Sequence, residues 1–286
     1  VGIRRQRQMC IRDRGYLAVP GRRTAHREPV LMMTNLFDLT GRKALVTGGA
    51  TGIGEGIALA LAAAGADVAL TYRSHAPDET LAKIAALGRT GTAVKADFGD
   101  MDQAAAAEVI AFATDALGGL DILVNNAGII HRAPSTDMPL DDWRRVLSVN
   151  LDSVWLLSQA AGKHMVAQGA GRIIIVASVL SSQGGLMVPA YASSKHAVLG
   201  LTRALCNEWA GHGVNVNAIA PGYTATDNTQ ALRDDPQRSK ALLERIPAGR
   251  FAEPAEIAGA AVFLASNAAK YCHGSVITVD GGWLAR

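Results

Sequence analysis

The chain contains 286 residues, of which 49% are hydrophobic and 19% charged, with a formal net charge of +3. This composition is typical of a globular chain with a sizeable buried core and excludes a wholly disordered one. The longest apolar runs, such as 173–178 and 258–266, are too short to span a bilayer, so no membrane partner is expected. The three cysteines are widely separated and no two histidines have HxxxH spacing, which indicates a cytoplasmic protein without a catalytic metal.

The first 35 residues differ from the rest of the chain in charge. Residues 1–35 carry eight arginines and two acidic residues, a local net charge of +6 that leaves −3 for the remainder. We expect a basic tail that is disordered or foreign to the natural protein, which would begin at Met32 or Met33; an arginine-rich targeting segment is the alternative. Because no basic or aromatic pattern continues into 36–286, no nucleic-acid partner is expected.

After residue 39, short apolar segments alternate with amphipathic ones. Strands rich in Val and Ile on both faces, each followed by a helix, are typical of a parallel sheet covered on both sides. We predict one α/β domain over 36–286, a doubly wound Rossmann fold with a central parallel sheet of about seven strands flanked by helices on both faces. Strands are predicted at 43–48, 67–72, 92–97, 120–128, 171–178, 214–222 and 275–282. Helices are predicted at 53–66, 78–88, 102–117, 140–168, 189–210 and 254–267.

The first predicted strand and helix are joined by the glycine-rich turn TGGATGIG, residues 47–54. Glycines there allow a tight bend and close approach of a pyrophosphate, while the helix N-terminus offers unpaired N–H groups to phosphate. An ordinary glycine turn is the alternative for so short a motif, but the flanking strand and helix favour a dinucleotide site. The residues predicted to contact the cofactor in this turn are Thr47, Gly48, Gly52, Ile53 and Gly54.

The end of the second predicted strand bears on which dinucleotide binds. An acidic residue there would accept a hydrogen bond from the ribose 2′-hydroxyl of NAD(H) and repel a 2′-phosphate. The chain instead has Tyr72, Arg73 and Ser74, and a guanidinium can make a bidentate contact with phosphate. We therefore predict that the protein accepts NADP(H) and modestly prefers it. The alternative is that Arg73 is a solvated surface residue and that NAD(H) or both cofactors are used.

A phenol and an ammonium group are predicted one helical turn apart, at Tyr191 and Lys195. Residues i and i+4 lie on one helix face, about 5–6 Å apart. The ammonium would favour the phenolate and lower the tyrosine pKa toward the range of a general acid or base. Ser178 closes a predicted strand at the edge where a substrate carbonyl would lie. A YxxxK pair alone occurs often by chance, but these motifs together indicate catalysis.

From about Leu36 to its end, the chain resembles the short-chain dehydrogenase/reductase family. The resemblance rests on TGGATGIG, NNAG at 125–128, Asn150 in SVNLDS, Ser178, YASSK at 191–195 and APGYTAT at 220–226. It implies a Rossmann domain that transfers hydride between NAD(P) and a secondary alcohol or ketone. It also implies a catalytic tetrad of Asn150, Ser178, Tyr191 and Lys195.

Each tetrad member has a role in the family's pattern. Tyr191 would transfer the proton, while Ser178 would orient and polarise the carbonyl. Lys195 would lower the tyrosine pKa and hold the nicotinamide ribose. Asn150 would interrupt its helix and hold a water that links Lys195 to solvent.

The same pattern implies further cofactor contacts. Asp97 would receive the adenine and Asn125 would border the cofactor. Thr226, with the backbone near Thr224, would hold the nicotinamide carboxamide. The contacts implied beyond the glycine turn are Asp97, Phe98, Asn125, Ala127, Gly128, Tyr191, Lys195, Pro221, Gly222, Thr224 and Thr226.

Several stretches resemble the members of this family that act on deoxy-keto sugar acids of uronate and pectin breakdown, and the segment 223–250 is long enough for a small helical lid. These stretches are SQGGLMVPAYASSK, NEWAGHGVNVNAIAPGY, DNTQALR, QRSKALLERIPAGR and VDGGWLAR. Such a substrate needs hydrogen-bond donors and a cation for its carboxylate. The predicted substrate contacts are Arg132, Ser178, Gln183 and Asn228.

Each of these substrate contacts could instead be a solvated loop residue. That alternative is favoured for Arg238 in the lid, since surface arginines are common. His131 and His196 also lie near the predicted site, where packing is a commoner role for histidine than a second base.

Two other functions share parts of this pattern. A 3-oxoacyl-thioester reductase would share the tetrad, but its substrate would demand a longer apolar groove and a basic patch for an acyl carrier. The predicted lid is polar and mixed in charge. A non-catalytic dinucleotide-sensing or interaction protein would be marked by loss of the tyrosine or the lysine, and both are present.

The resemblance also implies a homo-oligomer, either a tetramer or a dimer. Trp155 and Trp209 in predicted helices and Trp283 near the C-terminus are candidate exposed contact residues. The alternative is that these tryptophans belong to the core of a monomer.

Overall fold

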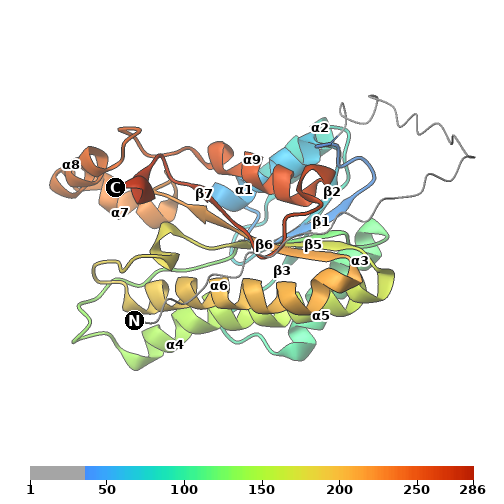
Figure 1. Cartoon of the computed structure of the whole chain (residues 1–286), viewed down its shortest axis with the longest axis horizontal. Helices are drawn as coiled ribbons and strands as arrows, with labels where there is room; N and C mark the ends of the chain where they lie inside the picture. Colours follow the sequence, from blue (N-terminus) through green and yellow to red (C-terminus); the bar gives the residue numbers. More distant parts are fainter. Residues whose placement is uncertain (1–35) are drawn as a thin grey trace, which may run out of the picture. The chain divides into compact units, whose positions relative to one another are not determined.

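The computed structural model describes residues 36–286, so the tail predicted over 1–35 lies outside the described residues. In this part of the chain, one parallel sheet of seven strands has the order β3-β2-β1-β4-β5-β6-β7 (Figure 1). The strands are β1 (Lys43–Val46), β2 (Asp67–Tyr72), β3 (Gly91–Lys95), β4 (Ile122–Asn125), β5 (Gly171–Val176), β6 (Val214–Pro221) and β7 (Val276–Val279). The predicted doubly wound α/β fold is confirmed.

The order of the strands reverses between β1 and β4. β1, β2 and β3 run outward to one edge of the sheet, and β4 to β7 continue from the other side of β1 to the opposite edge. In open α/β sheets, ligands bind beyond the carboxyl ends of the strands at this reversal. The turn after β1 lies there, because Val46 pairs with both Leu70 and Val124.

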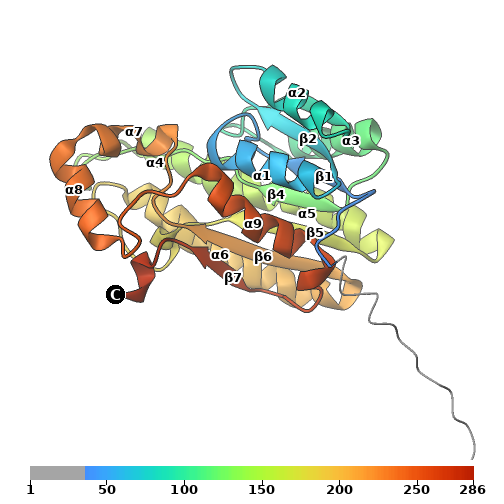
Figure 2. The same ribbon diagram turned by 90° about the horizontal axis from the view of Figure 1, so that it is seen from above.

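Helices cover both faces of the sheet. On one face, α1, α2 and α9 pack over the strands, with α1 and α9 side by side (Figure 2). On the other face lie α3, α5 and α6. The helices are α1 (Gly52–Ala63), α2 (Asp78–Ala86), α3 (Gln103–Leu117), α4 (Leu140–Leu147), α5 (Ser153–Gln168), α6 (Pro189–Trp209), α7 (Asp227–Asp234), α8 (Pro236–Arg245) and α9 (Pro254–Ala265).

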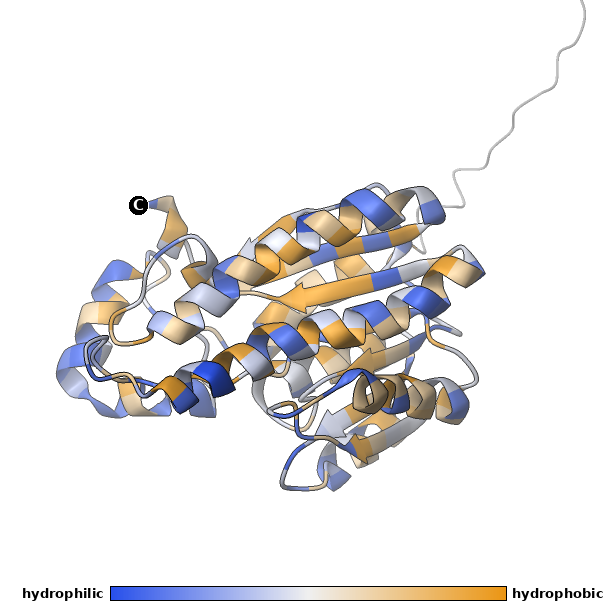
Figure 3. Cartoon of the chain, turned by 90° about the horizontal axis from the view of Figure 1, so that it is seen from below, coloured by the Kyte–Doolittle hydropathy of each residue, from blue (hydrophilic) through white to orange (hydrophobic). Residues whose placement is uncertain are grey.

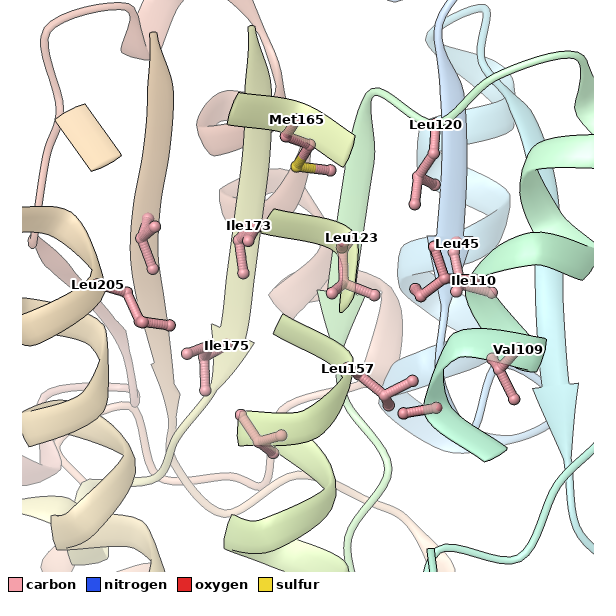
Figure 4. Close-up of a cluster of buried hydrophobic side chains, with 14 of the residues drawn as sticks. Leu45, Val109, Ile110, Leu120, Leu123, Leu157, Met165, Ile173, Ile175 and Leu205 are labelled. Atoms are coloured by element: carbon pink, nitrogen blue, oxygen red, sulfur yellow. The ribbon is translucent and has the colours of Figure 1, made fainter. Parts of the chain in front are cut away.

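Alternation along the strands fills the two layers of the core. Leu45 and Leu123 face α3 and α5 beside Leu157 (Figure 4), whereas the next residues in each strand, Val46 and Val124, face α1 and α9. Burying a side chain of this size contributes about 1.5–3 kcal/mol. The strands are accordingly coloured mainly as hydrophobic in Figure 3, while the helices alternate between hydrophobic and hydrophilic residues. Within residues 36–286, no helix is both long and apolar enough to cross a membrane.

Several predicted strands end too late, and one predicted helix is interrupted. β1, β4 and β5 stop before Thr47, Asn126 and Ala177, because the residues that follow turn at the carboxyl edge and build the site. The helix predicted over 140–168 is divided into α4 and α5 by a π-helical turn at Ser148–Asp152.

The predicted lid consists of α7 and α8, which lie at one end of the domain close to the C-terminal segment (Figures 1 and 2). A third apolar cluster joins α8 to the body of the domain. It contains Val179, Leu242, Ile246 and Trp283.

The prediction that three tryptophans are exposed is correct for only one of them. Trp155 on α5 is 37% exposed, whereas Trp283 is 3% exposed and belongs to the cluster beneath α8. Trp209 is half-buried and packs directly on Gly162. Trp283 is therefore part of the fold and not an exposed anchor.

Candidate active site

The helix α6 carries the predicted phenol and ammonium groups. Tyr191 lies in its first turn, two residues after Pro189, which begins the helix because proline needs no hydrogen-bond partner there. Lys195 lies one turn later, with its Nζ 5.6 Å from the centroid of the Tyr191 ring. The Lys195 ammonium donates a hydrogen bond of 2.7 Å to the carbonyl of Val176, at the end of β5.

The predicted net lowering of the Tyr191 pKa is wrong for this structure. Burial raises the pKa of Tyr191, while a hydrogen bond with the Ser178 side chain and the charge of Arg132 act in the opposite direction. Lys195 is not among the groups that shift this pKa, and its ammonium donates to the Val176 carbonyl. Tyr191 is therefore protonated at neutral pH, which suits a group that gives a proton to a carbonyl oxygen.

Lys195 is a buried cation, with only 5% of its surface exposed. Burial lowers the pKa of Lys195 to about 8, because the charged form is poorly solvated. At neutral pH the Lys195 ammonium therefore remains charged. Its hydrogen-bond partner is a backbone carbonyl, and it forms no ion pair with a carboxylate of residues 36–286.

Ser178 is held at the edge of the sheet by the turn that follows β5. It caps the 3₁₀ turn Val179–Ser181: its Oγ accepts from the N–H of Leu180 at 3.1 Å. Its own N–H donates to the hydroxyl of Ser181 at 3.2 Å. These bonds fix the side-chain oxygen of Ser178, and a hydrogen bond between Ser178 and Tyr191 acts to lower the pKa of the tyrosine.

Asn150 lies within the π-helical turn between α4 and α5 and is fully buried. Its Oδ1 accepts from the N–H of Ile129 at 2.8 Å, and its Nδ2 donates to the Ile129 carbonyl at 2.9 Å. The amide also donates to the hydroxyl of Ser194 at 3.2 Å. Both amide protons are thus engaged, and one lone pair of Oδ1 is left for a water. The side chain ties the segment after β4 to α6.

The glycine turn after β1 is held against the segment after β4. The Thr47 hydroxyl accepts from the N–H groups of Asn126 and Ala127 at 2.9 and 3.0 Å. The Asn126 side-chain amide donates to the carbonyls of Thr47 and Gly48 at 2.9 and 3.2 Å. Gly48 and Gly52 have φ of +61° and +56°, a region that favours glycine. The turn is therefore preformed.

This turn fits a dinucleotide pyrophosphate. No side chain caps the N-terminus of α1, so its first N–H groups point out of the helix toward the turn. A Cβ added at Gly52 would lie 3.2 Å from the Thr226 side chain, so any group bound between these residues needs glycine at position 52. Ile53 is half-buried and packs on the core beneath α1.

Gly54→Ala is expected to lower the free energy of unfolding by about 1–3 kcal/mol, the usual cost of overpacking, and to weaken cofactor binding. The added Cβ would lie 2.1 Å from the Gly48 carbonyl oxygen and 2.4 Å from Asn126 Nδ2, which forces the turn apart. Gly259→Ala on α9 is the control, because its Cβ would meet nothing within 4 Å. Chemical unfolding and cofactor titration measure both effects; wild-type values for Gly54→Ala would contradict the close packing.

The opposite end of the predicted cofactor site lies at the ends of β2 and β3. Arg73 is exposed, and its charge helps to lower the pKa of Asp97, which is lowered mainly by the N–H of Gly99. Asp97 also forms an ion pair of 2.9 Å with Arg145. The Phe98 side chain is buried in the core, so only its backbone could reach an adenine.

Asn125, which was predicted from the sequence to border the cofactor, and its neighbour Asn126 have different surroundings. The Asn125 side chain is buried and donates to the Ser158 hydroxyl on α5 at 3.0 Å, while its Oδ1 has no partner among residues 36–286. Asn126, which the sequence analysis missed, is the residue bound to the glycine turn. Ala127 is tied to Thr47, and Gly128 approaches Asn150 closely.

The segment after β6 borders the glycine turn from the other side. Gly222 packs against Asp280, where a Cβ would lie 2.6 Å from the Asp280 Cα. The buried Thr224 hydroxyl donates to the Gly222 carbonyl at 3.2 Å. Thr226 caps α7 and lies against Gly52. With Pro221 at the end of β6, these predicted cofactor residues form one continuous wall.

Two of the predicted substrate residues are linked. Arg132 donates to the Asn228 carbonyl at 2.9 Å, and its charge acts on Tyr191. Gln183 lies differently, because its Oε1 accepts from the indole N–H of Trp283 at 2.9 Å. Tyr223, which the sequence analysis missed, also acts to raise the pKa of Tyr191.

The two histidines near the site have other partners. His131 lies 3.6 Å from Asp142, and the His196 ring contacts the Ala192 carbonyl one turn earlier in α6. Over the described part of the chain, no group of three or more His, Cys, Asp or Glu side chains is placed to hold a metal ion.

Known proteins are similar to this chain over nearly the whole described domain. A family model described as enoyl-(acyl carrier protein) reductase matches residues 48–284. The 2-dehydro-3-deoxy-D-gluconate 5-dehydrogenase of Bacillus subtilis (strain 168) is 50% identical over 252 residues, which are 87% of this chain and 97% of that protein.

Solved structures match equally well. An Agrobacterium tumefaciens structure with bound NADP, described as a candidate 2-deoxy-D-gluconate 3-dehydrogenase, is 55% identical with a TM-score of 0.83, covering 88% of this chain and 100% of that one. The gluconate 5-dehydrogenase of Burkholderia cenocepacia J2315, in complex with NADP and tartrate, is 38% identical with a TM-score of 0.83, covering 88% and 98%.

Fold and site together define a doubly wound oxidoreductase that binds a nicotinamide dinucleotide. The chain belongs to the short-chain dehydrogenase/reductase family.

Proposed function

We propose that the protein is an NADP(H)-dependent oxidoreductase that interconverts a secondary alcohol and a ketone on a deoxy- or keto-gluconate-type sugar acid. The observation that carries this proposal is the grouping of Tyr191, Ser178 and the buried Lys195 at the same sheet edge as the glycine turn. When bound, the nicotinamide supplies or accepts the hydride at its C4 position.

The protein's own residues manage the proton and the carbonyl. Tyr191, kept protonated by burial, gives its proton to the carbonyl oxygen during reduction and recovers it during oxidation. Ser178 holds the same oxygen and stabilises the charge that develops there. Lys195, whose ammonium lies 5.6 Å from the centroid of the Tyr191 ring, replenishes the proton, and Asn150 keeps one Oδ1 lone pair for a water.

The adenosine end of the site supports NADP(H). Arg73 follows β2 and forms no ion pair with any carboxylate of residues 36–286, so its guanidinium is available to a 2′-phosphate. Two solved structures similar to this chain are described with bound NADP.

Arg73→Ala is expected to raise the KM for NADPH by about 10- to 100-fold, the value of one or two charge-assisted hydrogen bonds, with little change for NADH. Arg73→Lys keeps the charge but loses the bidentate geometry, and should lie between the two. Steady-state kinetics with both cofactors measure these values. A marked NADH preference in the parent, unaffected by the alanine variant, would refute the role of Arg73.

The substrate class rests on the relatives and on one cation. The four relatives at 49–52% identity are described as 2-dehydro-3-deoxy-D-gluconate 5-dehydrogenases. Arg132 lies near Tyr191 and has no ion-pair partner among the described residues, so it is suited to an anionic, polyhydroxylated substrate.

A substrate panel tests the proposal. The full chain is assayed by nicotinamide absorbance with 2-dehydro-3-deoxy-D-gluconate, 2-deoxy-D-gluconate and D-gluconate, each with NADP⁺ and NAD⁺. A 3-oxoacyl thioester with NADPH and a reaction without substrate complete the panel. Turnover of a sugar acid is expected; turnover of the thioester alone would favour the acyl-thioester reductase. No turnover despite dinucleotide binding would favour the non-catalytic protein.

The cellular setting completes the proposal. We place the protein in the cytoplasm, because Cys206 and Cys272 are unpaired thiols. We also propose a homo-oligomer, for which the exposed Trp155 on α5 is a candidate contact. Residues 36–286 form the catalytic domain, and the tail over 1–35 takes no part in the chemistry.

A further inference from the structure

The charges of three arginines act on Tyr223, which follows β6 at the carboxyl edge of the sheet. Burial raises the pKa of Tyr223, and the charges of Arg238, Arg245 and Arg132 act in the opposite direction. None of these three arginines forms an ion pair with a carboxylate of residues 36–286, whereas Arg250 does. Arginines without a carboxylate partner, close to the candidate active site, favour the binding of an anion.

Arg245 is the most firmly positioned of the three. Its guanidinium carbon lies 3.8 Å from the centroid of the Trp283 ring, and one of its nitrogens is 3.4 Å from the Gln183 side-chain oxygen. The Trp283 indole N–H donates to that same oxygen at 2.9 Å. A stacked guanidinium keeps its plane fixed and its remaining N–H groups free, the arrangement that binds a carboxylate through two hydrogen bonds.

The C-terminal segment holds Trp283 in this position. The N–H groups of Gly282 and Leu284 donate to the Asp280 carboxylate at 2.8 and 2.9 Å. The Gly281 carbonyl accepts from the N–H of Ala248, just after α8, at 3.0 Å. The Trp283 ring in turn packs on Tyr223 with their centroids 4.8 Å apart. The end of the chain thus joins α8, the loop after Ser178 and the edge of the active site.

The arginines differ in how they relate to the reacting position. The charge of Arg132 acts on both Tyr191 and Tyr223, whereas Arg238 and Arg245 act on Tyr223 but not on Tyr191. In the structure, Arg132 is bound to the Asn228 carbonyl, whereas Arg245 is stacked on the Trp283 ring, which in turn packs on Tyr223. A carboxylate next to the reacting carbon would meet Arg132, whereas one at the far end of a sugar acid would extend to Arg245.

We infer that Arg245, stacked on Trp283 and held by Gln183, binds a substrate carboxylate that lies several bonds from the carbon reacting at Tyr191. The inference rests on the proposed function and adds the place of the carboxylate to it. Arg132 then contacts oxygens nearer to the reacting carbon. Trp283 and Gln183 are positioning residues that act through Arg245.

The test compares a sugar acid with its neutral primary amide, for the full chain and its variants. Arg245→Gln is expected to raise the ratio of the KM for the acid to the KM for the amide by about 10- to 100-fold. Arg245→Lys should recover part of this loss. Lys240→Gln is the matched control on α8: Lys240 is 78% exposed and pairs with Glu244, so the ratio should not change.

Trp283→Leu examines the positioning role. It should raise the same ratio in the direction of Arg245→Gln, because the guanidinium loses the ring on which it is stacked. Thermal unfolding accompanies each variant, since Trp283 is also part of the cluster beneath α8. If Trp283→Leu raised the KM for the acid and the KM for the amide by the same factor, the contact between Trp283 and Arg245 would be purely structural.

Two outcomes would overturn the inference about Arg245. Both can be distinguished from a result that refutes the proposed function. Equal KM ratios for Arg245→Gln and the parent would show that the carboxylate binds elsewhere, as would a large effect confined to Arg132→Gln. If the parent turns over no sugar acid with either cofactor, the proposed function itself is wrong. Calorimetric titration of D-gluconate and gluconamide, with NADP⁺ present, makes the same comparison for Arg245 without turnover.

Discussion

Tyr191→Phe is expected to lower kcat for sugar-acid turnover by about 10²- to 10⁴-fold, the usual contribution of a positioned acid or base. The substitution removes the hydroxyl that shares a hydrogen bond with Ser178 and leaves the ring beside Lys195. Ser178 cannot substitute for it, because a serine hydroxyl is a much weaker acid and the Ser178 oxygen already accepts from Leu180. Cofactor affinity should change little.

Initial rates under saturating cofactor, with a parallel cofactor titration, measure this effect. Tyr271→Phe is the control for loss of a phenol at the surface, since Tyr271 is 97% exposed and lies beyond β6; its activity should equal that of the parent. Undiminished turnover in Tyr191→Phe, with thermal unfolding unchanged, would remove the basis of the proposed mechanism.

Lys195→Met is expected to lower kcat by at least about 10²-fold. Its effect on the free energy of unfolding, compared with the parent, should be more favourable at neutral pH than at alkaline pH. Burial lowers the pKa of Lys195 to about 8 in the folded protein, against 10.5 for an ordinary lysine. Between these values the unfolded chain binds more protons than the folded one, so the stability of the parent rises as the pH increases through that interval. Below about pH 8, the parent keeps the full cost of a buried charge.

The variant lacks this charge, so the difference in the free energy of unfolding between variant and parent should decrease as the pH rises. The free energy of unfolding of Lys195→Met, minus that of the parent, should be about 2 kcal/mol larger at pH 7 than at pH 9.5. The variant lacks the hydrogen bond to the Val176 carbonyl at both pH values, and any difference between ammonium and amine as its donor is already part of the pKa shift. Urea unfolding at the two pH values gives the comparison; a difference that is flat or that grows with pH would contradict the buried ammonium.

The linear pattern of the chain was sufficient for the sheet and for the motifs that contact each other locally. Strands rich in Val and Ile, separated by helices, allow few arrangements, because parallel strands require helical crossovers of one hand. The positions of Tyr191 and Lys195 follow from the helical repeat, and the glycine turn follows from the strand and helix that flank it. These features depend on residues close in sequence.

Contacts between distant segments needed the tertiary structure. Asn126, and not Asn125, is bound to the glycine turn, since the direction of each side chain depends on where β4 ends. The Tyr191 pKa is raised, because burial is set by segments from other parts of the chain.

Length, composition and strand pattern therefore determined the architecture, the glycine turn and the juxtaposition of Tyr191 and Lys195, because each depends on local periodicity and backbone freedom. The placement of Arg245 on Trp283, with Gln183 bonded to an indole 100 residues away, was decided only by the folded chain. No local pattern encodes it, because the three residues meet only after the lid, the loop after Ser178 and the C-terminal segment have packed into one apolar cluster.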